Sequence, residues 1–396
     1  MRGTAVPGFS VSRLPLLVFG PGSVAGLPKL VKGFGDRALL VTGGRSLADS
    51  KRLDEVLSGL KEVSIEVHPV PFFGEPSPES VDEAVAEFRG KGISVVVAMG
   101  GGSAVDAGKA VSAMLAEDGS VTEYLEGVGT LKPSGAKVPF IAVPTTAGTG
   151  SEATKNAVLS RVGPDGFKKS LRHDHYVPDA ALIDPELALT CPPEVAAACG
   201  VDAFTQLLEA YVCVKANPFT DSLAWGGLEA CRDHLVAACT GQDLKARSAM
   251  AFAAYASGVC LANAGLGVIH GLAGAVGGLH PIPHGVICGT LAAPAVDANL
   301  KALKACGEAG VPALLKYGRV GALLSGSDPR DVETSTRLLV DKLEEWTERL
   351  GIRSLHDCGL TLADADKIVA EAGLKENPVA LDQDAVKAIL VSGIAE

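Results

Sequence analysis

The chain has 396 residues, of which 47% are hydrophobic and 20% charged, a composition that excludes a disordered chain and predicts two globular domains. Its formal net charge of −11 argues against nucleic acid or an anionic membrane as the main partner, although loop amides can still bind an anionic cofactor. The nine cysteines are odd in number, form no CxxC pair and all lie at or after Cys191, which favours reduced thiols and a cytoplasmic location.

The first half of the chain alternates apolar, β-branched runs with segments of helical spacing. An initial apolar run, Leu14 to Phe19, is too short for a signal-peptide core or a membrane span. Ser77 or Ser80 is a possible cap of the second helix. The expected strands are 38–42, 64–70, 94–99 and 139–143, and the expected helices are 47–62, 76–89 and 103–115. This alternation predicts an α/β domain with a parallel sheet.

From Cys191 onward, strand-like runs disappear and long segments rich in alanine and leucine predict an all-helical second domain. The expected helices are 193–214, 222–238, 244–267, 312–322, 331–350, 362–372 and 384–391. Pro192 and Pro193 are typical of a helix start, so we place the domain boundary there, giving domains 1–190 and 191–396.

One stretch of the second half, between Arg247 and Asp297, contains no Asp, Glu, Lys or Arg. A membrane helix is one interpretation. We favour a pair of core helices, because the stretch is rich in glycine and alanine, is broken by two prolines and carries three histidines.

A glycine-rich loop, Gly100-Gly101-Gly102-Ser103, follows the buried strand 94–99 and opens the next helix. Glycines let the backbone approach a pyrophosphate, and Ser103 could cap the helix, whose free amides attract anionic oxygens. The loop is neither a complete GxGxxG nor a Walker A motif, so a plain tight turn is the alternative to a phosphate cradle.

A second loop, Pro144 to Glu152, also follows a strand and is crowded with hydroxyl groups, including those of Thr145, Thr146 and Thr149. It could bind a ribose, a phosphate or a nicotinamide amide, although solvated loops of this composition are common. Two such loops at the carboxyl ends of parallel strands favour a ligand site, because open α/β sheets bind ligands at that edge.

The turn after the first predicted strand bears on the choice of cofactor. It reads Gly43-Gly44-Arg45-Ser46 and lacks the acidic side chain that usually accepts from the ribose 2′-hydroxyl of NAD. A 2′-phosphate would not be repelled here, so we expect NADP in preference to NAD. The alternative is that this loop only turns the chain.

Candidate metal ligands lie in the second half. Asp202 and Gln206 are four residues apart on one predicted helix and share a face, and His270, His280 and His284 fall in the uncharged stretch. A carboxylate with imidazoles in apolar surroundings suits Fe²⁺ or Zn²⁺. A single buried histidine is more often a satisfied core group, but three within fifteen residues favour a site.

Four segments together resemble the iron-containing (group III) alcohol dehydrogenases: GGGSAVDAGKA, PTTAGTGSEAT, GVDAFTQLLEAY and HGLAGAVGGLHPIPHG. The resemblance covers nearly the whole chain. It implies a Rossmann-like N-terminal domain, an all-helical C-terminal domain, and a cleft between them that holds a nicotinamide cofactor and a metal. Members of this family are mostly cytoplasmic oligomers, often dimers, so a homodimer or higher homo-oligomer is expected.

Carried over residue by residue, the resemblance implies metal binding by Asp202, His270 and His284, with Lys168 near the nicotinamide. Two positions depart from the family. Gln206 stands where a histidine usually provides the second ligand, and Gly274 stands where a histidine is implicated in proton relay. We retain Gln206 as a candidate ligand. The candidate cofactor-binding residues are Gly43, Gly44, Ser46, Ser77, Gly100, Gly101, Gly102, Ser103, Asp106, Thr145, Thr146, Thr149 and Lys168.

These residues predict a metal-dependent, NAD(P)-linked enzyme that moves a hydride between a small alcohol or aldehyde and nicotinamide. The candidate catalytic residues are His270, His280, which could relay the proton, and Lys168. Two alternatives are a lyase related to dehydroquinate synthase and a nucleotide-binding homologue that has lost its metal site.

Overall fold

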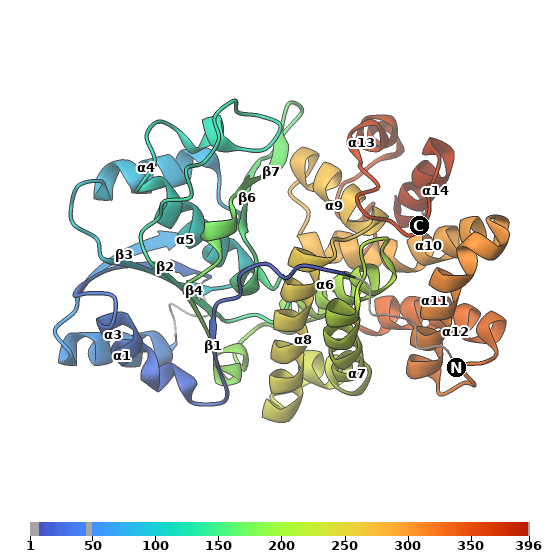
Figure 1. Cartoon of the computed structure of the whole chain (residues 1–396), viewed down its shortest axis with the longest axis horizontal. Helices are drawn as coiled ribbons and strands as arrows, with labels where there is room; N and C mark the ends of the chain where they lie inside the picture. Colours follow the sequence, from blue (N-terminus) through green and yellow to red (C-terminus); the bar gives the residue numbers. More distant parts are fainter. Residues whose placement is uncertain (1–7, 45–49, 395–396) are drawn as a thin grey trace.

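The computed structural model of the protein describes residues 8–44 and 50–394. Its N-terminal half contains a six-stranded parallel sheet with helices on both faces, and its C-terminal half is helical (Figure 1). This confirms the predicted α/β domain followed by an all-α region. The strand order is β1 (Leu16–Phe19), β8 (Ala180–Ile183), β5 (Phe140–Pro144), β4 (Val95–Gly100), β2 (Arg37–Gly43) and β3 (Glu66–Phe72).

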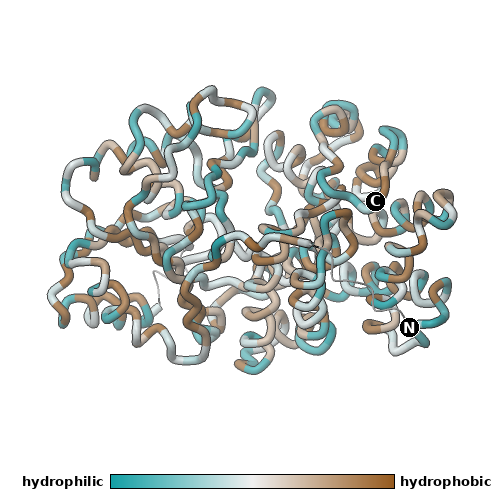
Figure 2. The backbone as a smooth tube through the Cα atoms, viewed as in Figure 1, coloured by the Kyte–Doolittle hydropathy of each residue, from teal (hydrophilic) through white to brown (hydrophobic). Residues whose placement is uncertain are grey.

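The central strands are continuous apolar runs because both of their faces are covered. In β4, Val96 and Ala98 pack with α4 (Pro78–Phe88) and α5 (Gly102–Met114). The alternate residues Val95 and Val97 pack on the other face with α1 (Leu27–Lys32) and α3 (Lys51–Glu62). Strand residues point alternately to opposite faces, so an unbroken apolar strand can supply both cores. Figure 2 shows these strands as hydrophobic and the outer loops as largely hydrophilic.

Several strands differ from the sequence-based expectation. The predicted strand 64–70 begins two residues later, at Glu66, after Ser64 turns the chain with a φ of 57°. Edge strand β1 and the short β8 were not predicted. Neither was the antiparallel hairpin of β6 (Asn156–Arg161) and β7 (Phe167–Arg172), whose lysines and arginines hide the period-two pattern.

Nine α-helices form the described part of the second half, around one apolar core. They are α6 (Pro193–Val212), α7 (Pro218–Thr240), α8 (Leu244–Asn263), α9 (Val268–Leu279), α10 (His284–Ala305), α11 (Val311–Ser325), α12 (Val332–Arg349), α13 (Ala365–Glu371) and α14 (Gln383–Ile394). The predicted helix 244–267 instead ends at Asn263, and the chain bends by 96° into α9.

The stretch without charged residues forms residues 248–263 of α8, all of α9 and residues 284–296 of α10. By length and hydropathy α6 and α10 could each cross a membrane, as could α8 and α9 together if the bent pair formed one span. In this fold the apolar windows of α6 and α10 are 89% and 67% buried, and both helices contribute to the helical core.

The two halves touch closely where the hydroxyl-rich loop reaches α8. Gly150 has a φ of +61°, and a Cβ there would lie 2.5 Å from the Cα of Gly258. Neither residue has a side chain, so the backbones of loop and helix can meet. Between the halves, β8 ends at Ile183 and α6 begins at Pro193, with Pro192 as its N-cap.

Candidate active site

The glycine-rich loop leads directly from β4 into α5. The helix begins at Gly102, and its N-cap is Gly101, which offers no side chain to the free amides. Ser103, which the sequence predicted as the cap, lies instead in the first turn. The amide groups of this turn are therefore not used by a side-chain cap and can receive an anionic oxygen.

A cavity of about 560 Å³ opens at this point, at the carboxyl ends of β2, β4 and β5. Its size is in the usual range for cofactor sites. Six of the predicted cofactor-binding residues line it: Gly43, Gly44, Gly101, Ser103, Thr145 and Thr146. The other half of the molecule contributes Cys191, Pro192 and Val195, at the start of α6. The cavity thus lies between the sheet and the helical half.

The other predicted cofactor-binding residues occupy different places. Gly100 and Gly102 pack under the loop, where a Cβ would lie 2.6 Å from Ala104 and from Thr149, respectively. The hydroxyl of Ser77 accepts from the amide of Ser80 as the N-cap of α4. Ser46 lies outside the described residues.

Asp106 belongs to a buried polar network beneath the cavity. Its carboxylate accepts hydrogen bonds from the Ser151 hydroxyl and from the amide of Val158, 3.2 Å away. Lys109, on the same helix, lies within hydrogen-bond distance of four oxygens: those of the Ser151 carbonyl (2.8 Å) and hydroxyl (3.2 Å), the Thr154 hydroxyl (3.0 Å) and the Asn156 carbonyl (2.8 Å). The network fixes the hydroxyl-rich loop against α5, which makes Asp106 a support of the cavity.

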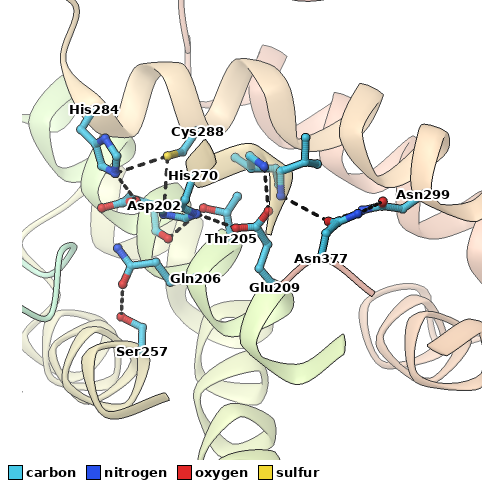
Figure 3. A network of polar contacts seen from close by, with 12 residues as sticks. Asp202, Thr205, Gln206, Glu209, Ser257, His270, His284, Cys288, Asn299 and Asn377 are labelled. Carbon is cyan, nitrogen blue, oxygen red and sulfur yellow. Dashed lines mark hydrogen bonds and ion pairs between the residues drawn. The ribbon is translucent and has the colours of Figure 1, made fainter. Parts of the chain in front are cut away.

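A second buried cluster joins three helices of the C-terminal half (Figure 3). Asp202 is on α6, His270 is in the first turn of α9, and His284 and Cys288 are on α10. One ligand atom from each of these four residues lies within 4.8 Å of the others. The Oδ1 atom of Asp202 is 3.3 Å from Nε2 of His270 and 3.7 Å from Nε2 of His284.

A glutamate that the sequence analysis missed orients this cluster. Oε2 of Glu209 lies 2.7 Å from Nδ1 of His270, and its Oε1 accepts from the amide of Ile269 at 2.8 Å. With Nδ1–H donating to Glu209, the lone pair of Nε2 faces Asp202, which is the usual second-sphere arrangement of metal-binding histidines. Glu209 is seven residues, two helical turns, beyond Asp202, and this spacing was readable in the sequence.

The cluster fits a divalent cation. Burial lowers the pKa of His284 to about 4, although Asp202 opposes this shift, so the imidazole is neutral at neutral pH. Burial works against ionisation of Asp202, but His284 and the hydrogen-bonding partners of the carboxylate outweigh it and lower the pKa of this group. Burial also opposes protonation of His270, but Cys288 and the neighbouring carboxylates raise its pKa well above its ordinary value. A carboxylate and imidazole nitrogens converging in a largely buried site suit a metal ion, whose binding would displace the proton of His270.

Two other predicted site residues have different partners. Oε1 of Gln206 accepts from the Ser257 hydroxyl at 2.8 Å, and a hydrogen bond from Gln206 helps to lower the pKa of Asp202. Nε2 of His280 lies 3.4 Å from the carboxylate of Asp364. The structure therefore places Gln206 and His280 outside the four-residue cluster.

Lys168, on β7, donates to the carboxylate of Glu75. Both groups are close enough to His284 to act on its pKa, Lys168 lowering it and Glu75 raising it. Lys168 is thus close to the cluster, at the side where the imidazole of His284 is 26% exposed.

The cavity and the cluster share helix α6. Val195 lines the cavity, and Asp202 lies seven residues further on, which is about 10 Å along a helix axis. Between them, Cys199 is hydrogen-bonded to the side chain of Thr146, which also lines the cavity. A bound molecule that fills the cavity and extends along α6 would therefore approach the cluster.

Comparisons with known proteins agree with this arrangement. The model of the iron-containing alcohol dehydrogenase family matches residues 15–185, and that of its C-terminal domain matches residues 196–394. The chain is 33% identical over 374 residues to the probable alcohol dehydrogenase EutG of Escherichia coli (strain K12), covering 92% of this chain and 89% of that protein. It is 31% identical over 399 residues to alcohol dehydrogenase 4 of Saccharomyces cerevisiae (strain ATCC 204508 / S288c), covering 98% of each.

The fold is similarly matched. An archaeal halo-thermophilic alcohol dehydrogenase from a Red Sea brine pool superposes with a TM-score of 0.88 at 26% identity, covering 97% of this chain and 98% of that one.

Proposed function

Because the chain belongs to the iron-containing alcohol dehydrogenase family and is an oxidoreductase that couples an alcohol to NAD(P), we propose that its nucleotide binds in the cavity at the start of α5 and its metal among Asp202, His270 and His284. The observation that carries this assignment is the position of both sites along one helix, α6. The lyase alternative is not favoured, because the matching relatives are alcohol dehydrogenases.

The pyrophosphate of the cofactor would accept hydrogen bonds from the amides at the start of α5, which no side chain caps. Thr145 and Thr146 offer hydroxyls from the neighbouring loop, where Thr146 lies directly against Gly101. The nicotinamide would then extend along α6 toward the metal. With Gly43 and Gly44 at the far end, the adenosine ribose meets backbone rather than a side chain.

NADP is the preferred cofactor in this proposal. Among the described residues that line the cavity, the only acid is Glu186, and its carboxylate is neutralised by Arg52 at 2.6 Å. A 2′-phosphate therefore meets no free carboxylate there, and a 2′-hydroxyl finds no acidic partner. Equilibrium titration with NADPH and NADH tests this directly. We expect tighter binding of NADPH, and equal or tighter binding of NADH would contradict the preference.

The metal supplies a Lewis acid that lowers the pKa of an alcohol and polarises an aldehyde carbonyl. The residues of the chain hold it and exclude water. Asp202 gives the anionic ligand, His270 is fixed in its tautomer by Glu209, and His284 presents a neutral imidazole at the partly open side. Lys168 beside His284 is ion-paired with Glu75, and these two opposite charges shift the pKa of His284 in opposite directions. Hydride transfer itself is the chemistry of the nicotinamide.

Elemental analysis of anaerobically purified protein, followed by NADPH oxidation with a panel of short aldehydes, tests the assignment. We expect about one Fe²⁺ or Zn²⁺ per chain and turnover that is lost with a chelator and restored by metal. Absence of metal together with absence of turnover after adding Fe²⁺ or Zn²⁺ would overturn it and would favour a homologue without a working metal site.

The enzyme is further proposed to be a cytoplasmic homo-oligomer, a dimer in its simplest form. All nine cysteines are unpaired, in agreement with a reducing compartment. On edge strand β1, Leu16 and Phe19 are exposed, and apolar edge strands promote association. Sedimentation equilibrium measures the oligomer directly, and a monomer at all concentrations would contradict this part.

A further inference from the structure

Cys288 is the fourth member of the buried cluster and has no role in the function proposed above. It lies four residues after His284 on α10, so both side chains project from one face of the helix. Its Sγ atom is 3.7 Å from Nε2 of His284 and also 3.7 Å from Nε2 of His270 (Figure 3). The sulfur is therefore directed at the same point as the two imidazoles.

Other buried cysteines of the helical half behave differently. The Sγ atoms of Cys213 and Cys260 lie 3.4 Å from backbone carbonyl oxygens, at Ala264 and Thr220, as expected for weak S–H donors. Cys288 instead faces two imidazole nitrogens, and a cation could use the lone pairs of both once it displaces the proton of His270. One thiol hydrogen could serve only one of those nitrogens, whereas one metal ion between the three atoms would satisfy all of them.

The separations between these atoms match the edges of a tetrahedron around a metal ion. Bonds of about 2.3 Å to sulfur and about 2.0 Å to nitrogen or oxygen give tetrahedral edges of about 3.5 Å for S···N and about 3.3 Å for N···O. The observed S···N distances are both 3.7 Å, and the N···O distances to Asp202 are 3.3 and 3.7 Å. These four edges differ from the ideal values by about 0.4 Å or less, and the remaining S···O and N···N separations are no more than 4.8 Å.

Gln206 is not placed to provide a fourth ligand atom to the cluster. Its one ligand atom, Oε1, is engaged by the Ser257 hydroxyl at 2.8 Å, and in Figure 3 Gln206 and Cys288 lie on opposite sides of Asp202. The amide nitrogen of Gln206 carries hydrogens and can only donate, which suits its hydrogen bond to the carboxylate of Asp202.

We propose that Cys288, as a thiolate, is the fourth protein ligand of the metal and compensates for the imidazole that is missing at Gln206. This rests on the proposed function, since it assumes a metal between Asp202, His270 and His284. On coordination the S–H bond breaks and its proton leaves to solvent. One thiolate, two imidazoles and one carboxylate form a softer ligand set than imidazoles and a carboxylate alone, which favours Zn²⁺. Zinc also accepts five ligands, so substrate access is retained.

The wild-type enzyme provides the first test. X-ray absorption at the zinc edge should show one sulfur neighbour per metal at about 2.3 Å. After replacement of the metal by Co²⁺, the spectrum should contain a near-ultraviolet thiolate-to-metal charge-transfer band. Bound metal with no sulfur neighbour and no such band would overturn the proposal, and neither measurement depends on the folding of a variant.

Cys288→Ala provides the second test. We expect the charge-transfer band to vanish and Zn²⁺ affinity to fall at least roughly ten- to a hundred-fold, since outer-sphere partners alone are worth that much. Cys231→Ala, which removes an equally buried thiol on α7 outside the cluster, should leave both unchanged. Adding Gln206→His to Cys288→Ala should recover affinity by returning an imidazole to α6.

The outcomes distinguish a failure of the proposed metal site from a failure of the role proposed for Cys288. If the wild type binds none of Fe²⁺, Zn²⁺ and Co²⁺, the proposed function itself fails. If it binds about one metal with unchanged affinity in Cys288→Ala, the metal assignment stands and the role of Cys288 is refuted.

Discussion

Two buried polar clusters, one between α5 and the hydroxyl-rich loop and one among α6, α9 and α10, are built on opposite principles. Around Lys109, one ammonium group donates to oxygens of Ser151, Thr154 and Asn156, so donors and acceptors are matched within the protein. Around Asp202, a carboxylate, two imidazole nitrogens and a sulfur face one another at 3.3 to 3.7 Å. In addition, Nδ1 of His284 is buried and has no hydrogen-bond partner among the described residues.

This difference separates a structural network from a binding site. A matched network is complete in the folded chain and stabilises it, whereas converging lone pairs are complete only when a cation joins them. Burial and perturbed pKa values alone do not distinguish the two, because both clusters have them. Removal of one residue should therefore damage stability in the first cluster and metal binding in the second.

The largest effect is expected at the metal cluster. His270→Ala removes an imidazole ligand and leaves Asp202 and Glu209 facing an empty space, so bound metal should fall from about one per chain to near zero and turnover should be abolished. Nucleotide titration should remain normal, because His270 does not line the cavity. His356→Ala, at an exposed histidine, is the control. Full metal content in His270→Ala would refute the assignment.

Lys109→Met should instead lower stability. It leaves Asp106 and several carbonyl oxygens buried without their cation, which costs about 3 kcal/mol or more in the free energy of unfolding. Denaturant unfolding measures this, and metal content should be unchanged. The same substitution at the exposed Lys301, which pairs with Asp297, should cost less than about 1 kcal/mol. Comparable losses in both variants would remove the distinction between the clusters.

A smaller effect is expected from Glu209→Gln. The amide is neutral, and its nitrogen would face Nδ1–H of His270. The imidazole would therefore be less firmly oriented and less basic. Metal affinity should fall roughly ten- to a hundred-fold, a loss that competition with a chelator measures. Exposed Glu344→Gln serves as the control. Unchanged affinity would mean that Glu209 only caps α9.

The smallest effect is expected in the pH dependence of folding stability. Burial raises the pKa of Glu152 from 4.5 to about 7, against the attraction of Lys109, so the folded state holds this proton more tightly than the unfolded state. The resulting stabilisation is complete below about pH 4.5 and is lost as the pH rises through about 7. Glu152→Gln should therefore flatten this part of the stability profile. Thermal unfolding at pH 5 and pH 7.5 compares the two proteins, and parallel profiles would contradict this.

Much of the N-terminal half could be predicted from the sequence, because buried parallel strands are continuous apolar runs and their following loops are rich in glycine and hydroxyls. Asp202, Gln206 and three histidines were also identified, since charged or imidazole groups are rare in such apolar helices, and the resemblance to the family then implied Asp202, His270 and His284 as ligands. The packing of α6, α9 and α10 that brings them together is long-range and leaves no local signal. Cys288 was therefore interpreted as an ordinary buried thiol, although its spacing from His284 was visible.

The hairpin of β6 and β7 is a second feature that could not be predicted from the sequence. Its residues are largely polar and its strands short, so no periodicity distinguished it from a loop. Likewise, the sequence identified Ser103 as a helix cap, whereas the helix begins one residue earlier and leaves its amides to the ligand. Boundaries of this kind depend on where the chain must turn to pack, which a single sequence does not encode locally.

The contact between Gly150 and Gly258 constrains how the cleft can open. The loop that carries Thr145 and Thr146 touches the α8 backbone there, and the next residue along α8 toward its start, Ser257, holds Gln206 beside Asp202. A rotation of one half against the other that preserves this close backbone contact would have it as its pivot. The cleft would then swing widest at its remote rim and least beside the metal, so a nucleotide could enter and leave while the ligand geometry stays constant.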